Sequence, residues 1–111
     1  MIRLILIADQ EHELRLCLTH ALREHAILEA ASAAEALRYV KYLDHLDLAV
    51  LGENFPDATR AELADALKAR FGDGLFILYS PRSGQGDSLL LRREIVNLAR
   101  TSLGHRAMAA S

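Results

Sequence analysis

The feature that most constrains this chain is the alternation of short aliphatic runs with segments of helical spacing. The aliphatic runs are residues 2–8, 26–30, 48–51 and 75–79, each of strand length. In the segments between them, apolar residues recur every three or four positions, which is typical of an amphipathic helix. Four repeats of strand and helix predict parallel strands joined by right-handed crossovers, with helices on both faces of the sheet. We therefore expect a doubly wound α/β sheet in three layers.

Capping signals mark where the helices begin. Ser32 and Glu35 have the spacing at which a serine and a glutamate bind each other's backbone N–H groups, and Thr59 and Glu62 repeat it. Gly72 is placed to end the third helix. The helices are expected over residues 11–24, 32–43, 59–71 and 87–103. Their predicted inward residues include Leu14, Cys17, Leu18, Ala21, Leu22, Leu37, Val40, Leu43, Leu63, Ala66, Leu67 and Phe71.

Length and charge restrict the function classes. The chain has 111 residues, which suit one domain over residues 1–103 and a flexible tail over residues 104–111. A formal charge of −2 argues against a nucleic-acid surface, which needs clustered positive charge. No apolar run is long enough to cross a bilayer, the first residues do not resemble a secretory signal, and Cys17 is the single cysteine. We expect a cytoplasmic protein with no membrane or nucleic-acid partner.

Doubly wound sheets place their working groups at the carboxyl ends of the strands, here residues 8–11, 52–56 and 80–82. Around these ends, residues 4–11 (LILIADQE), 30–37 (AASAAEAL), 47–57 (DLAVLGENFPD) and 76–80 (FILYS) resemble the receiver domain of bacterial two-component response regulators. The resemblance implies a flavodoxin-like fold with strand order 2-1-3-4 and a role in phosphorelay signalling.

The sequence departs from the family at the residues that carry its chemistry. Gly52 stands where the family has its phosphoacceptor aspartate, and Gln10 replaces one member of the acidic pair, leaving Asp9. No lysine follows Lys68, so the family's conserved lysine has no counterpart. One carboxylate with a neutral amide is a poor Mg²⁺ site, so we expect no metal and no cofactor. Ser80 keeps the place of the family's switch hydroxyl. The pattern indicates a pseudo-receiver whose degenerate phosphorylation pocket comprises Asp9, Gln10, Gly52, Glu53 and Ser80.

Several of these residues have a second interpretation. Asp9 is either a remnant metal ligand or a cap of the first helix, and we favour the cap because helix starts need such groups more often than sites do. Glu53 could replace the missing carboxylate, but a solvated position is favoured because neighbouring residues at a strand end point to opposite faces. Ser80 either binds an anion or satisfies nearby backbone. Cys17 is expected in the core, and His12 is the only histidine expected near Asp9.

The C-terminal third predicts an interface. No β-branched run follows Ser80, so a fifth strand is expected to be missing or altered, leaving the fourth strand at an edge. The last helix carries one apolar stripe that can pack on the sheet and a second stripe formed by Leu89, Val96 and Leu103. The second stripe needs another partner. We expect a homodimer through this helix.

Three functions are compatible with these patterns. The first is a receiver-like module without a phosphoacceptor that acts by protein–protein contact or dimerisation. The second is a response regulator that retains phosphotransfer on a shifted carboxylate, Glu53 or Asp9. The third is a flavodoxin-like cofactor binder, which is disfavoured because residues 8–13 are acidic where a phosphate loop would be needed. No nucleophile–base pair is evident, so an enzyme is not expected.

Overall fold

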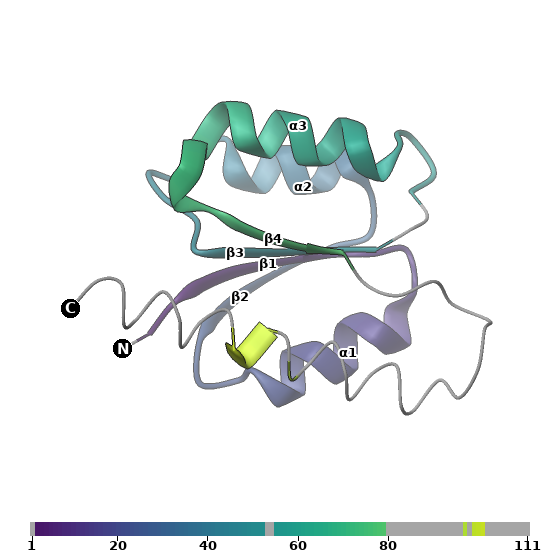
Figure 1. Ribbon diagram of the computed structural model, residues 1–111. Helices are drawn as coiled ribbons and strands as arrows, with labels where there is room; N and C mark the ends of the chain where they lie inside the picture. The colour runs from purple at the N-terminus through teal and green to yellow at the C-terminus, as the bar shows by residue number, and fades with distance from the viewer. Residues whose placement is uncertain (1, 53–54, 80–96, 98, 102–111) are drawn as a thin grey trace.

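A computed structural model describes residues 2–52, 55–79, 97 and 99–101 (Figure 1). Four parallel strands form one sheet in the order β2-β1-β3-β4. The elements are β1 (Leu4–Ala8), α1 (His12–Ala21), β2 (Ala26–Ala30), α2 (Ala33–Val40), β3 (Leu48–Leu51), α3 (Arg60–Phe71), a 3₁₀ turn (Gly72–Gly74) and β4 (Phe76–Tyr79). The α/β class and the strand order predicted from the sequence are confirmed.

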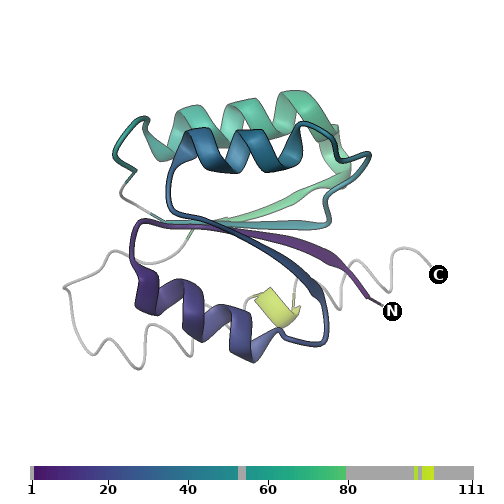
Figure 2. The same cartoon turned by 180° about the vertical axis from the view of Figure 1, so that it is seen from behind.

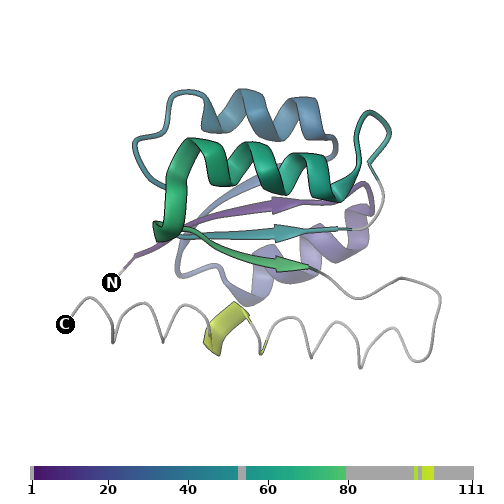
Figure 3. The same cartoon turned by 45° about the horizontal axis from the view of Figure 1, so that its top comes forward.

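Helices cover both faces of the sheet. Helices α2 and α3 lie side by side on one face (Figures 1 and 3), and α1 lies on the other, as the reverse view shows (Figure 2). Since β1 is central and aliphatic, its alternate side chains enter two separate cores. The core under α2 and α3 is built from Leu6, Ala8, Ala30, Ala33, Ala36, Val40, Leu46, Ala49, Leu51, Leu63, Ala64, Leu67 and Leu75. The core under α1 is built from Ile5, Ile7, Leu14, Leu18, Leu22, Leu48, Val50 and Ala99.

The described part of the last helix belongs to the α1 side. Ala99 is fully buried in the core under α1. Arg100 Nη2 donates to the carbonyl oxygen of Ala21 at 3.0 Å, close to the end of α1. This segment therefore packs against its own chain.

The capping predictions for α2 and α3 are confirmed in different degrees. Thr59 and Glu62 form the complete reciprocal box at the start of α3. At α2, Ser32 Oγ accepts from the Glu35 N–H as expected, but Glu35 Oε1 accepts from the Ala31 N–H at 2.9 Å instead of from Ser32. Gly72 ends α3 with φ 71°, the only positive φ among the residues that the structure describes.

Four details of the helix predictions are wrong. Helix α2 ends at Val40, three residues before its expected end at residue 43. Helix α1 ends at Ala21, three residues early, because the chain turns at Leu22, whose carbonyl accepts from the His25 N–H at 2.9 Å. Leu37 is exposed, since α2 buries Ala33, Ala36 and Val40 and a helix rotates about 100° per residue. Cys17 is only partly buried.

Several predictions fall outside the described residues. These are the positions of Glu53, Ser80, Leu89, Val96 and Leu103, the question of a fifth strand, and the tail over residues 104–111. Within the part of the chain that the structure describes, no helix is both long and apolar enough to cross a bilayer.

Candidate functional site

The candidate site lies where β1 and β3 end. The parallel ladder continues one residue past each strand: the Asp9 N–H donates to Ala30 O at 3.0 Å, and the Gly52 N–H donates to Ala8 O at 2.7 Å. Asp9 and Gly52 are thereby held side by side at the carboxyl edge of the sheet. Both lie in the buried interior of this edge, and Asp9 is only 6% exposed.

The Asp9 carboxylate occupies the space that a side chain at position 52 would need. A Cβ atom built on Gly52 would lie 2.1 Å from Asp9 Oδ2 and 2.2 Å from Asp9 Cγ. Both separations are far inside van der Waals contact, so no side chain fits at position 52 while Asp9 keeps this conformation. The glycine is thus required by a close approach, and not by its φ angle, which is not positive.

Asp9 is held in this conformation by neighbouring groups. Its Oδ1 accepts a hydrogen bond from the Glu11 N–H at 2.8 Å. Its backbone carbonyl accepts from Arg15 Nη1. Arg15 in turn places Nε 3.6 Å from Glu29 Oε1 on β2. The backbone and the carboxylate of Asp9 are therefore fixed from α1 and from the loop before it.

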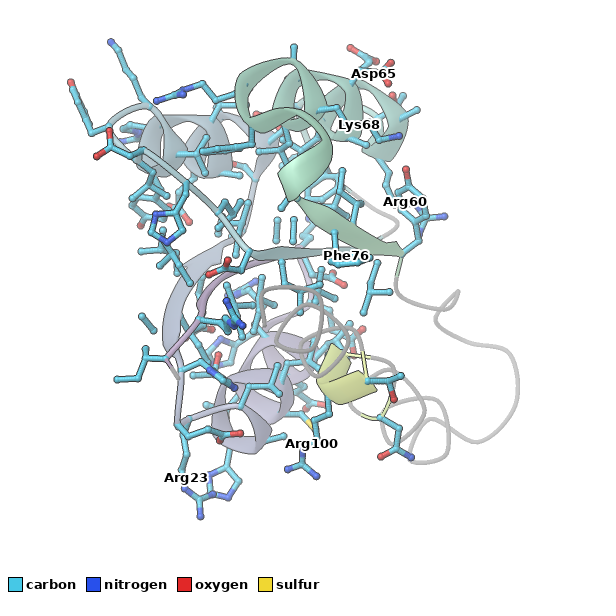
Figure 4. All side chains as sticks on the ribbon, turned by 60° about the vertical axis from the view of Figure 1, so that its left-hand side comes forward. Arg23, Arg60, Asp65, Lys68, Phe76 and Arg100 are labelled. Atoms are coloured by element: carbon cyan, nitrogen blue, oxygen red, sulfur yellow. The ribbon has the colours of Figure 1, made fainter. Side chains whose placement is uncertain are left out.

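Electrostatics around Asp9 oppose its ionisation. The pKa of Asp9 is raised, chiefly because burial disfavours the charged carboxylate, although the Glu11 N–H bond lowers it. The negative charge of Glu11 raises the pKa further, and the charges of Arg15 and Arg60 lower it. Arg60 begins α3 and lies beside the end of β4, with its guanidinium 4.8 Å from the ring centroid of Tyr79 (Figure 4). Two arginines from different helices thus act on one carboxylate.

The loop after β3 is tied to the start of α2. Asp57 accepts hydrogen bonds from the Ala33 N–H at 3.0 Å and from the Ala34 N–H at 2.8 Å. These bonds lower the pKa of Asp57, the Ala34 bond contributing most. The carboxylate also faces the positive end of the α2 dipole. Asp57 therefore has a structural role and is not available as a substitute acid in the pocket.

The described residues do not fit the Mg²⁺ ion that the resemblance to receiver domains implies. Gln10 is exposed, Gly52 offers no ligand, and one oxygen of Asp9 already binds the Glu11 N–H. No group of three histidine, cysteine, aspartate or glutamate side chains is suitably gathered among the described residues. Octahedral coordination by oxygen ligands needs more than the described residues at this edge supply.

The prediction that Asp9 caps α1 is wrong, although its Oδ1 does accept a hydrogen bond from the Glu11 N–H just before the helix. The N-cap is Glu11, which makes no side-chain cap bond, and Asp9 lies two residues earlier. His12, expected near the site, is exposed and has Nδ1 3.3 Å from Arg15 Nη2.

The sequence interpretation missed Arg15, Asp57 and Arg60 as site residues. Arg15 had a usable signal, because it stands three residues before Leu18 and seven before Leu22, on the buried stripe of α1. A charged residue at such a position needs a polar partner. The sequence gives no comparable signal for Asp57 or Arg60, since their partners lie in distant parts of the chain.

Comparisons with known proteins agree with this fold. A receiver domain from Methanospirillum hungatei JF-1, described as CheY-like, superposes with a TM-score of 0.72 at 18% identity, covering 98% of this chain and 99% of that one. The chemotaxis response regulator CheY4 of Vibrio cholerae gives 0.64 at 18% identity, over 86% and 81%. A structure described as adenylate cyclase from Rhodopirellula baltica gives 0.74 at 13% identity, over 99% and 93%.

These similarities concern the fold. No family model matches the sequence, and a search of curated proteins finds no match either. The chain therefore has the receiver fold, which proteins with different described functions share.

Proposed function

We propose that this chain is a receiver-like signalling module that has no phosphoacceptor and acts through contacts with other proteins. One observation carries the proposal: the carboxylate of Asp9 fills the volume in which an acceptor side chain at position 52 would stand. A phosphoryl group needs a carboxylate that projects from the end of β3, and Gly52 has no side chain.

The surroundings of the pocket support the same function. Asp9 is buried and bonded to the Glu11 N–H, Arg15 holds its backbone, and Asp57 is engaged with α2. Each group is used to fix the local backbone. A site of this kind serves as a rigid scaffold that presents the outer surfaces of the helices, which is a binding role and not catalysis.

The proposed partners are signalling proteins, including a second copy of the same chain. The homodimer would use the second apolar stripe of the last helix, Leu89, Val96 and Leu103. Support comes from the sequence pattern alone, because these three residues lie outside the described part of the chain. Light scattering at micromolar concentration is expected to give twice the mass of the chain, and a monomer would contradict the dimer.

Labelling with a small phosphodonor tests the central claim. The full chain is incubated with a radiolabelled phosphodonor and Mg²⁺, beside an intact receiver domain as the positive control. We expect no stable label on this chain. Label that maps to Asp9 or Glu53, and disappears in Asp9→Asn or Glu53→Gln, would instead establish phosphotransfer on a shifted carboxylate.

A further inference from the structure

The last turn of α2 and the two residues after it expose an unusual set of side chains. Tyr42 is 81% exposed, Tyr39 is 41% exposed and Leu37 is 39% exposed. Arg38 and Lys41 are also exposed, and the segment from residue 37 to residue 43 contains no acidic residue, although the exposed Asp44 follows it. We refer to Leu37, Arg38, Tyr39, Lys41 and Tyr42 as the α2 patch.

Helical geometry makes the α2 patch continuous. Successive residues are rotated by about 100°, so within this turn only Val40 points into the core, where it is buried. Leu37, Arg38 and Tyr39 lie on the solvent side of this turn, and the exposed Lys41 and Tyr42 follow it directly in the chain. The Lys41 ammonium lies 5.7 Å from the ring centroid of Tyr42, which places the positive charge directly beside the aromatic face.

A third cation reaches the patch from α3. Arg70 Nη2 donates to the carbonyl oxygen of Leu43 at 2.5 Å, next to Tyr42 in the chain. Helices α2 and α3 lie side by side (Figure 3), so the end of α3 borders the patch. Arg38, Lys41 and Arg70 therefore give this surface a net positive charge, with the neighbouring Asp44 offsetting one of the three cations, on a chain whose formal net charge is −2.

We infer that the α2 patch, together with Arg70, is a docking surface for an acidic, partly apolar segment of a partner protein. The inference rests on the proposed function, for which it names a surface and a class of partner. Tyrosine and arginine are the residue types enriched where protein interfaces bind most strongly. Positive charge beside exposed aromatic and aliphatic surface complements a segment that carries both carboxylates and apolar side chains.

Other anionic partners suit this surface less well. Specific nucleic-acid binding commonly uses about 6–10 phosphate contacts, and the surface offers three cations. An anionic membrane contributes about 1 kcal/mol of binding free energy for each nearby cation, so the three cations would supply only about 3 kcal/mol. A polypeptide can use the tyrosines and the cations together, so it fits better than either alternative.

Peptide display tests the inference. Random 12-residue peptides are selected on the full chain, and the enriched peptides are measured by fluorescence anisotropy. We expect sequences with net negative charge and apolar residues, which bind about tenfold more weakly to Arg38→Glu and to Tyr42→Ala. Arg23→Glu is the matched control, because Arg23 is an exposed arginine at the α1 side of the molecule (Figure 4).

Three results would overturn the inference. They are enriched peptides without acidic character, equal losses in Arg38→Glu and Arg23→Glu, or tighter patch-dependent binding of phosphatidylserine vesicles or an oligonucleotide than of the peptides. The variants change exposed residues, and circular dichroism verifies that they fold. The phosphodonor experiment has a separate readout, so label on a carboxylate would refute the proposed function while leaving the measurement of peptide binding intact.

Discussion

Replacing Gly52 with alanine tests the geometry on which the proposed function depends. The added Cβ would lie 2.1 Å from Asp9 Oδ2, so the Asp9 carboxylate must move. Moving it breaks the 2.8 Å hydrogen bond between Oδ1 and the Glu11 N–H. A hydrogen bond to a charged group contributes about 1.5–3 kcal/mol.

Part of this loss is offset in the unfolded state. Alanine restricts the unfolded chain and stabilises a protein by about 0.4–1 kcal/mol where the native φ and ψ allow it, and φ at Gly52 is not positive. The expected net destabilisation of Gly52→Ala is therefore about 1–2 kcal/mol. Urea unfolding should show it as a lower midpoint with an unchanged slope.

A double-mutant cycle shows whether Asp9 causes the effect. Asp9→Ala removes Oδ2 and Cγ and leaves only Asp9 Cβ, 2.8 Å from the added atom, which a small backbone shift relieves. Gly52→Ala should then cost much less in the Asp9→Ala background, with a coupling energy of about 1 kcal/mol or more. Equal costs in both backgrounds, or a Gly52→Ala protein as stable as the parent, would refute the reasoning.

Three further predictions concern the same fold. Asp57→Ala should destabilise the chain and speed hydrogen exchange at the Ala33 and Ala34 amides, because both bonds to α2 are lost. Since the pKa of Asp57 is lowered in the fold, its contribution is present above the ordinary value of 3.8 and is lost as pH falls through the folded pKa, which urea titrations of parent and variant will compare. The pKa of Asp9 is raised in the fold, so its pH dependence runs the other way: its contribution to stability is fully present below 3.8 and is lost as pH rises through the folded pKa. Asp9→Asn should therefore be at least as stable as the parent at pH 7, and urea unfolding of the variant should lack this pH dependence. Leu67→Ala should cost about 2–5 kcal/mol in urea unfolding because Leu67 is fully buried, whereas a cost below about 0.5 kcal/mol is expected for the exposed Leu37→Ala.

The candidate site could be predicted from the sequence only in part. Asp9 and Gly52 follow aliphatic runs that can be recognised as strands, and parallel strands bring their carboxyl ends to one edge. That reasoning placed the two residues together, as the structure confirms. It did not reveal that the Asp9 carboxylate fills the position 52 space, because this depends on a side-chain conformation set by the Glu11 N–H and Arg15.

The amino-acid sequence by itself determined the element types, the bounds of β2 and β3 and the capping of α3, because periodicity, caps and aliphatic runs are local properties of the chain. The strand order was predicted only through the resemblance to receiver domains, and the structure confirms it. Only the tertiary structure decided which face each helix buries, as Leu37 and Cys17 illustrate, and which distant groups meet, as with Asp57 and α2. The physical reason is that helix rotation and long-range hydrogen bonds are set by packing against partners that are remote in sequence.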